Sequence, residues 1–158
     1  MTLYTFTLSV HNILRWVVLI LGLIAVIRAY CGWLGKRDWT ESDRKFGVFF
    51  TMALDIQVLL GLILYFFLSP FTRAIFTDLA SVTGNMGGES FFYSFEHIFV
   101  MIVAVALAHI GSARSKKALE PSAKHRQAAI FFTLAILAIL IGVPWKRAWL
   151  RLGAWSVG

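Results

Sequence analysis

The stretch from residue 90 to residue 112, SFFYSFEHIFVMIVAVALAHIGS, constrains the fold more than any other part of the chain. It is almost entirely apolar, and a helix of about 23 residues is long enough to span the hydrocarbon core of a bilayer. The stretch nevertheless contains Glu96, His97 and His109. Because ionisable groups inside a membrane span are costly, we expect these three residues to mark a functional site.

Three further apolar segments accompany this one, at residues 8–30, 46–68 and 128–143. Hydrophobic residues make up 59% of the chain, which is more than a soluble domain of this size carries. Each segment is long enough, or nearly so, to cross a membrane. We therefore predict an all-α fold, a single domain over residues 1–158, built as a four-helix transmembrane bundle with helices at about 5–31, 46–69, 90–113 and 122–143.

The chain carries 15 Lys and Arg residues against 8 Asp and Glu residues, but the distribution of this charge indicates topology rather than nucleic-acid binding. Basic residues gather at the first and third connections, where they are Arg28, Lys36, Arg37, Arg44 and Lys45, and Arg114, Lys116, Lys117, Lys124 and Arg126. The positive-inside rule places these connections in the cytoplasm and both termini outside. Such a basic face is also expected to touch anionic lipid.

The second span is expected to end at Ser69 and Pro70, because serine caps helices well and proline fits the first helical turn. Residues 70–80 place apolar side chains four residues apart among polar ones. This spacing predicts a short interfacial helix on the outer surface, between the second and third spans. Residues 145–155, with three tryptophans and three basic residues, are predicted to form an amphipathic tail at the same interface.

The four histidines fall at two membrane depths. His11 and His97 each lie about seven or eight residues from the outer start of parallel helices, so they share one depth. His109 lies twelve residues after His97, which is about 18 Å further along the helix and near its inner end. His125 lies in the first turn of the fourth helix, at the same inner level. The sequence therefore predicts one histidine pair at each side of the membrane.

Paired histidines in a helix bundle are typical of a cytochrome, because neutral imidazoles are good axial ligands on the two faces of a haem. Arg15 follows His11 by one turn and is placed to pair with a haem propionate. With Cys31 as its one cysteine, the chain has no CxxCH motif, so its haem would be noncovalent, b-type haem. We expect one or two haems. Structural, hydrogen-bonded histidines are the alternative, which is favoured for His125 beside Lys124.

Two acidic residues are candidates for proton transfer or quinone contact. Glu96 adjoins His97 and is expected either to pair with Arg15 or to accept a proton from a quinol. Asp55 lies about 14 Å from the cytoplasmic start of the second apolar segment, where it needs a partner or must be protonated. Two roles are open for Asp55: a proton-transfer group, or a protonated structural group that is hydrogen-bonded between helices.

Five short motifs resemble, in the same order, a family of small bacterial four-helix membrane proteins labelled "cytochrome b". They are HNILRW (His11–Trp16), QVLLGLILYFFLSP (Gln57–Pro70), EHIFVM (Glu96–Met101), AHIG (Ala108–Gly111) and VPW (Val143–Trp145). The resemblance implies a multi-pass protein of the bacterial inner membrane that takes part in electron transfer. It also implies that His11 and His97, with His109 as a further candidate, stand at the family's recurring histidine positions.

We expect from this an electron carrier rather than a stand-alone enzyme, moving electrons between a quinol and a redox partner. Its expected partners are membrane lipid and a larger membrane complex or a second copy of the chain. The alternative is a cofactor-poor accessory subunit of a respiratory or photosynthetic complex, whose small-residue faces bind protein. Proton or small-solute transport through Arg15, Asp55 and Glu96 is less favoured, because four helices without internal repeats offer little for a transport path.

Overall fold

The computed structural model describes residues 2–86 and 88–145, and every regular element in these ranges is helical. The order is α1 (Leu3–Leu34), α2 (Glu41–Ile63), the π-helical turn η1 (Leu64–Leu68), α3 (Pro70–Thr77), α4 (Leu79–Gly84), α5 (Glu89–Phe91), the π-helical turn η2 (Phe92–Glu96), α6 (His97–Lys117) and α7 (Pro121–Gly142). Joined through the π turns, they form four spans in the described ranges that are long and apolar enough to cross a membrane. The all-helical prediction with four candidate transmembrane helices is thereby confirmed.

The spans extend further into the polar connections than their apolar segments indicated. Helix α2 begins at Glu41 rather than near residue 46, because Thr40 and Asp43 cap it reciprocally: each side chain accepts a hydrogen bond from the other's backbone N–H. Helix α6 continues to Lys117, with basic residues in its last turn where the helix dipole favours cations. The apolar pattern thus predicts the membrane-spanning part, whereas caps and charges determine the helix ends.

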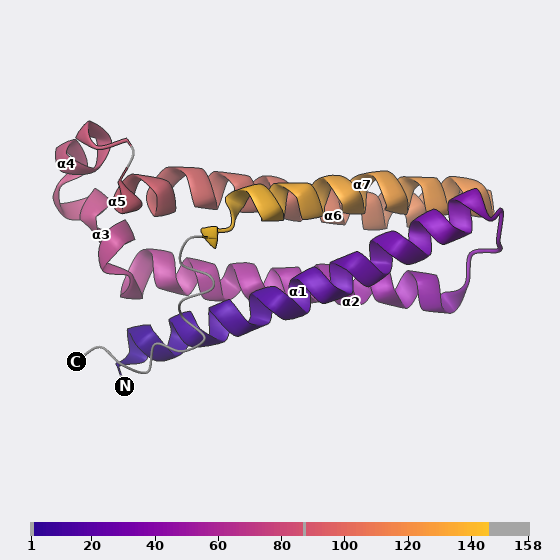
Figure 1. Ribbon diagram of the computed structural model, residues 1–158, viewed down its shortest axis with the longest axis horizontal. Helices are drawn as coiled ribbons and strands as arrows, with labels where there is room; N and C mark the ends of the chain where they lie inside the picture. The colour runs from indigo at the N-terminus through magenta and orange to yellow at the C-terminus, as the bar shows by residue number, and fades with distance from the viewer. Residues whose placement is uncertain (1, 87, 146–158) are drawn as a thin grey trace.

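The four long helices form two antiparallel pairs, α1 with α2 and α6 with α7 (Figure 1). Helix α1 also packs against α7, and α2 packs against α6. The main contacts therefore form a four-sided ring in which the parallel helices α1 and α6 lie on one diagonal. In Figure 1 the two pairs diverge toward the end that carries the N-terminus, where the short helices α3 to α5 link them.

Small side chains allow close packing along much of the bundle. Ala104 and Ala108 of α6 are completely buried, and Gly22 of α1 leaves no room for a methyl group because Ile136 of α7 occupies that space. The rings of Phe50 and Phe132 meet edge to face, with centroids 5.5 Å apart. Large apolar side chains point outward from all four helices, as expected for a bundle whose surroundings are lipid.

The segment after the second span differs in detail from the single helix predicted over 70–80. A helix does begin at Pro70, but Asp78 interrupts it and caps a second helix, its carboxylate accepting a hydrogen bond from Ser81 N at 3.0 Å. The buried Thr72 hydroxyl donates to Tyr65 O at 2.7 Å and so fastens α3 to the end of the second span. The predicted amphipathic tail lies, beyond Trp145, outside the described residues.

Candidate functional site

A cavity of about 150 Å³ lies at the end of the bundle that carries the N-terminus. His11 and Arg15 line it from α1, and His97 and Met101 line it from α6. The two histidines are at matching depths, because His11 follows the start of its span by as many residues as His97 follows Glu89. The structure therefore brings the predicted outer pair to one cavity, from helices on the same diagonal of the bundle.

Two π-helical turns flank this cavity, η1 at the end of the second span and η2 immediately before His97. The Tyr65 hydroxyl of η1 donates a hydrogen bond to the Ser94 carbonyl of η2, at 3.1 Å. A π turn inserts an extra residue into a helix and commonly occurs at functional sites. Neither turn is predictable from the sequence, because the apolar pattern runs through both without a proline or glycine.

His97 is held by the backbone at the end of α7. Its Nδ1 lies 2.8 Å from the carbonyl oxygen of Gly142, so Nδ1 carries the hydrogen and Nε2 keeps its lone pair. Gly142 favours this close approach, because an added Cβ there would lie 3.1 Å from Val100 and displace the flexible end of Met101. A backbone carbonyl that fixes an imidazole in this way commonly accompanies metal-binding histidines. The neutral imidazole is thus held in the tautomer whose Nε2 can accept a hydrogen bond or bind a metal.

His11 is positioned by two residues of α2. Gln57 donates its side-chain amide to the backbone carbonyl of His11 at 3.0 Å, and Gly61 faces the imidazole across a small gap, which an added Cβ would close to 3.4 Å from Cε1. The Nδ1 atom of His11 is buried, and no hydrogen-bond partner for it occurs in the described part of the chain. Because leaving a buried polar atom unpaired is costly, a ligand in the cavity would compensate it.

Arg15 lies one turn further along α1 and is only 8% exposed. Its guanidinium carbon is 5.5 Å from the centre of the Trp16 ring, and its Nε is buried without a hydrogen-bond partner within residues 2–86 and 88–145. In the same ranges Arg15 is in no ion pair, and the predicted partner Glu96 is exposed. A cation buried in this way favours an anionic ligand.

His109 and His125, predicted to lie at the inner level, have different neighbours, and the structure does not pair them with each other. His109 of α6 contacts Asp55 of α2, with 2.8 Å between Nε2 and Oδ1. Both side chains are about half exposed, at 50% and 49%. Asp55 therefore has a polar partner, as its depth in the span requires, and the partner is the histidine that sequence analysis assigned to a haem.

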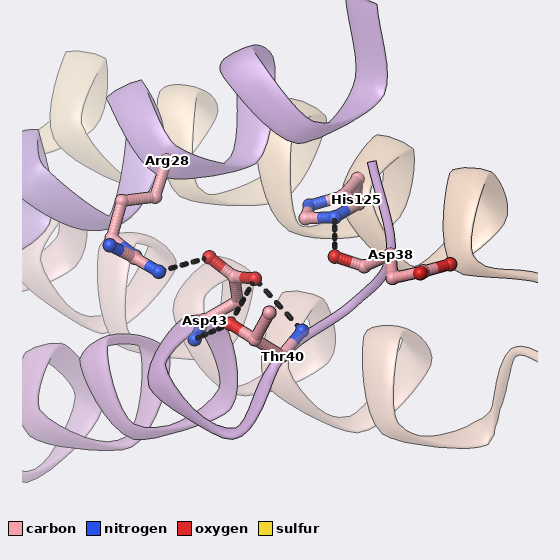
Figure 2. Close-up of polar contacts among 5 residues, drawn as sticks. All are labelled: Arg28, Asp38, Thr40, Asp43 and His125. Atoms are coloured by element: carbon pink, nitrogen blue, oxygen red, sulfur yellow. Dashed lines mark hydrogen bonds and ion pairs between the residues drawn. The ribbon is translucent and has the colours of Figure 1, made fainter. Parts of the chain in front are cut away.

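His125 is completely enclosed at the far end of the bundle (Figure 2). Its Nε2 lies 3.4 Å from the Asp38 carbonyl oxygen, Trp39 packs edge-on with ring centroids 4.8 Å apart, and a methyl group at Gly32 would overlap the imidazole. No face of this ring is open to a macrocycle. The arrangement favours the structural alternative for His125, in which it fastens the connection between α1 and α2 to α7.

An adjacent ion pair strengthens this end of the bundle (Figure 2). Arg28 of α1 lies 2.7 Å from Asp43 of α2, and the Asp43 carboxylate also accepts the Thr40 hydroxyl at 2.7 Å. Sequence analysis treated Arg28 as a topology signal only. The charge pattern of the sequence does not predict this ion pair, because it depends on how closely α1 and α2 approach each other.

Comparison of the chain with protein-family models, with curated proteins and with solved structures finds no match. The resemblance to the "cytochrome b" proteins therefore stays a prediction. Within the described residues no group of three or more His, Cys, Asp or Glu side chains could hold a metal ion alone. Two histidines facing one cavity are, however, the protein ligand set that a bis-histidine haem requires.

Proposed function

We propose that the protein is a membrane-embedded b-type cytochrome that holds one haem b between His11 and His97 and carries electrons. The observation that supports this most strongly is the cavity itself, which both imidazoles line from diagonal helices at equal depth. One imidazole is oriented by a backbone carbonyl, and the other has a buried nitrogen without a partner in the described residues. The backbone carbonyl at His97 is the second contact that metal-binding histidines commonly make, and the unpaired nitrogen of His11 supports a ligand in the cavity.

The cavity residues fit the proposed group chemically. His11 and His97 would supply the axial nitrogens, Arg15 would pair with a propionate, and Gly61 leaves clearance beside the His11 ring. When bound, haem supplies one-electron redox chemistry. The chain itself sets the tautomer of His97, neutralises negative charge through Arg15 and keeps water away with an apolar lining. The cavity is smaller than typical ligand sites, so we expect flexible lining side chains such as Met101 to move on binding.

Substitution of single histidines tests the proposed ligands. We expect His11→Ala and His97→Ala to remove haem from the purified protein, as quantified by pyridine haemochrome. His109→Ala is the matched control, because it removes a histidine of the same span that does not line the cavity. Normal haem content in His97→Ala, or haem loss only in His109→Ala, would contradict the assignment.

The proposed location is the bacterial inner membrane, with both termini and the histidine cavity toward the outside. The support is the charge distribution, since the connections at the opposite end hold most of the basic residues. A quinol is the proposed electron donor. Glu96 is the proposed proton acceptor near the cavity, because it adjoins His97 and is exposed.

A second candidate function, an accessory subunit of a larger membrane complex, is favoured by the His109–Asp55 pair. A polar pair that is half exposed within membrane spans is costly against lipid, and a partner subunit or second copy would cover it. We expect His109→Leu combined with Asp55→Leu to release such a partner while leaving the isolated protein folded, as measured by native gel electrophoresis of mild-detergent extracts. A complex of unchanged size would argue against this face as the interface.

A further inference from the structure

A second cavity, of about 360 Å³, lies at the opposite end of the bundle from His11 and His97. It is bounded by the beginning of α2, the end of α6 and the first turns of α7. This is the end where the basic connections gather. Its lining shares no residue with the histidine cavity or with the proposed haem site.

The acidic groups of this cavity are neutralised within the chain. Glu41 forms an ion pair with Arg44, and Asp43 forms one with Arg28 at 2.7 Å. Lys116 of α6 and Lys124 of α7 also line the cavity, and neither is in an ion pair within the described residues. Two lysines from different helices, without an ion-pair partner in the described residues, therefore line the cavity.

Apolar side chains also line the cavity, together with the hydroxyl residues Thr40, Ser112 and Ser115. Phe132 of α7 and Val48 of α2 line it, and Gly47 lets the Phe132 ring approach α2, since an added Cβ at Gly47 would lie 3.1 Å from that ring. Trp39, a residue type that favours membrane interfaces, also lines it. A cavity that combines cations, hydroxyl groups and apolar side chains at the end of membrane spans matches the junction between a phospholipid headgroup and its glycerol ester region.

We propose that this cavity binds the phosphate of an anionic phospholipid, with Lys116 and Lys124 as its cationic ligands and the ester region against Phe132. Lysine binds phosphate as a point charge, and basic pockets between transmembrane helices at the cytoplasmic side bind anionic headgroups. Inorganic phosphate shares the charge but would make no use of the apolar side chains in the lining. The two sources therefore differ in an experiment, and the inference does not rest on the proposed haem.

Native mass spectrometry of the full-length protein in mild detergent, titrated with phosphatidylglycerol or phosphatidylcholine, tests the proposal. We expect one tightly held phosphatidylglycerol, with affinity reduced about tenfold or more in the double variant Lys116→Gln, Lys124→Gln. The matched control is Lys117→Gln, Arg126→Gln, which removes the same charge from neighbouring positions that do not line the cavity. The charge-conserving variant Lys116→Arg, Lys124→Arg is expected to retain binding, which separates loss of charge from loss of fold.

Three results would overturn the proposal. If the control double variant lost as much affinity for phosphatidylglycerol, the lipid would be attracted by surface charge in general rather than by this cavity. If phosphatidylcholine were bound as tightly as phosphatidylglycerol, the negative charge of the headgroup would not be recognised. Displacement of phosphatidylglycerol by millimolar inorganic phosphate, with the same dependence on Lys116 and Lys124, would show a site for free phosphate rather than for lipid.

Discussion

The Nδ1 atom of His97 lies 2.8 Å from the carbonyl oxygen of Gly142, so the end of α7 determines how a histidine of α6 faces the cavity. The carbonyl is within reach because Gly142 has no side chain to keep α6 and α7 apart. The last turn of the fourth span is therefore part of the site, although it contributes no side chain to the proposed ligand set.

Gly142→Ala is expected to disturb the cavity. Its methyl group would displace the flexible end of Met101 and lie 3.1 Å from the stiff, β-branched Val100, so we expect α7 to shift and the contact to His97 to lengthen. Overpacking of this kind typically costs about 1–3 kcal/mol. We expect a lower melting temperature and a clear loss of haem content, both measured on purified protein. Gly84→Ala is the control, because nothing lies within 4 Å of an added Cβ there; equal behaviour of the two variants would contradict the role of Gly142.

Gly32→Ala is expected to destabilise the other end of the bundle without affecting haem. The methyl group would overlap the enclosed His125 ring, which cannot move because Trp39 packs against it. We expect a loss of about 1–3 kcal/mol or more in the free energy of unfolding. Adding His125→Ala should restore part of the lost free energy of unfolding, because the space that the imidazole occupied is then free for the methyl group. A haem content that falls together with stability would show that the two ends are not independent.

Arg15→Leu is expected to have opposite effects on the empty and the haem-loaded protein. Without haem the variant should melt at a higher temperature, because a buried cation with no ion-pair partner in the described residues is replaced by an apolar side chain. With haem the midpoint potential should fall by roughly tens of millivolts, since removing a nearby cation stabilises the oxidised form. Arg15→Lys keeps the charge and serves as control. A potential unchanged in Arg15→Leu would leave Arg15 with a structural role.

The topology prediction can be tested by labelling single cysteines. In a Cys31→Ser background, Leu119→Cys reports on the connection between α6 and α7, and Thr77→Cys reports on the end of α3; both positions are exposed. A membrane-impermeant maleimide should label position 77 in right-side-out vesicles and position 119 only in inverted ones. The reverse labelling pattern would show the opposite orientation in the membrane, with the histidine cavity on the cytoplasmic side.

Much of the candidate site could be predicted because it follows from helical periodicity and depth. His11 and Arg15 share a face of one helix, and His97 lies at the same distance from the start of a parallel span. These relationships need only the start and direction of each helix. These relationships can therefore be predicted without knowing which helices are neighbours in the bundle.

The contacts that escaped prediction depend on the order of helices around the bundle. His109 contacts Asp55 because α6 packs against α2, and His125 is enclosed because α1 brings Gly32 against α7. Depth alone made His109 and His125 a plausible pair. The link from His97 to Gly142 depends on where α7 ends, which a sequence pattern does not specify to the residue.

The most direct measurement is a dithionite-reduced minus oxidised absorption spectrum of the purified protein, expressed with ample haem, together with the haem content per chain. The account predicts a sharp b-type α-band and close to one haem per chain, because His11 and His97 share one cavity whereas His109 and His125 have other partners. A flat spectrum would contradict the cytochrome proposal and favour the accessory-subunit alternative. Two haems per chain would contradict the assignment of structural roles to the inner histidines.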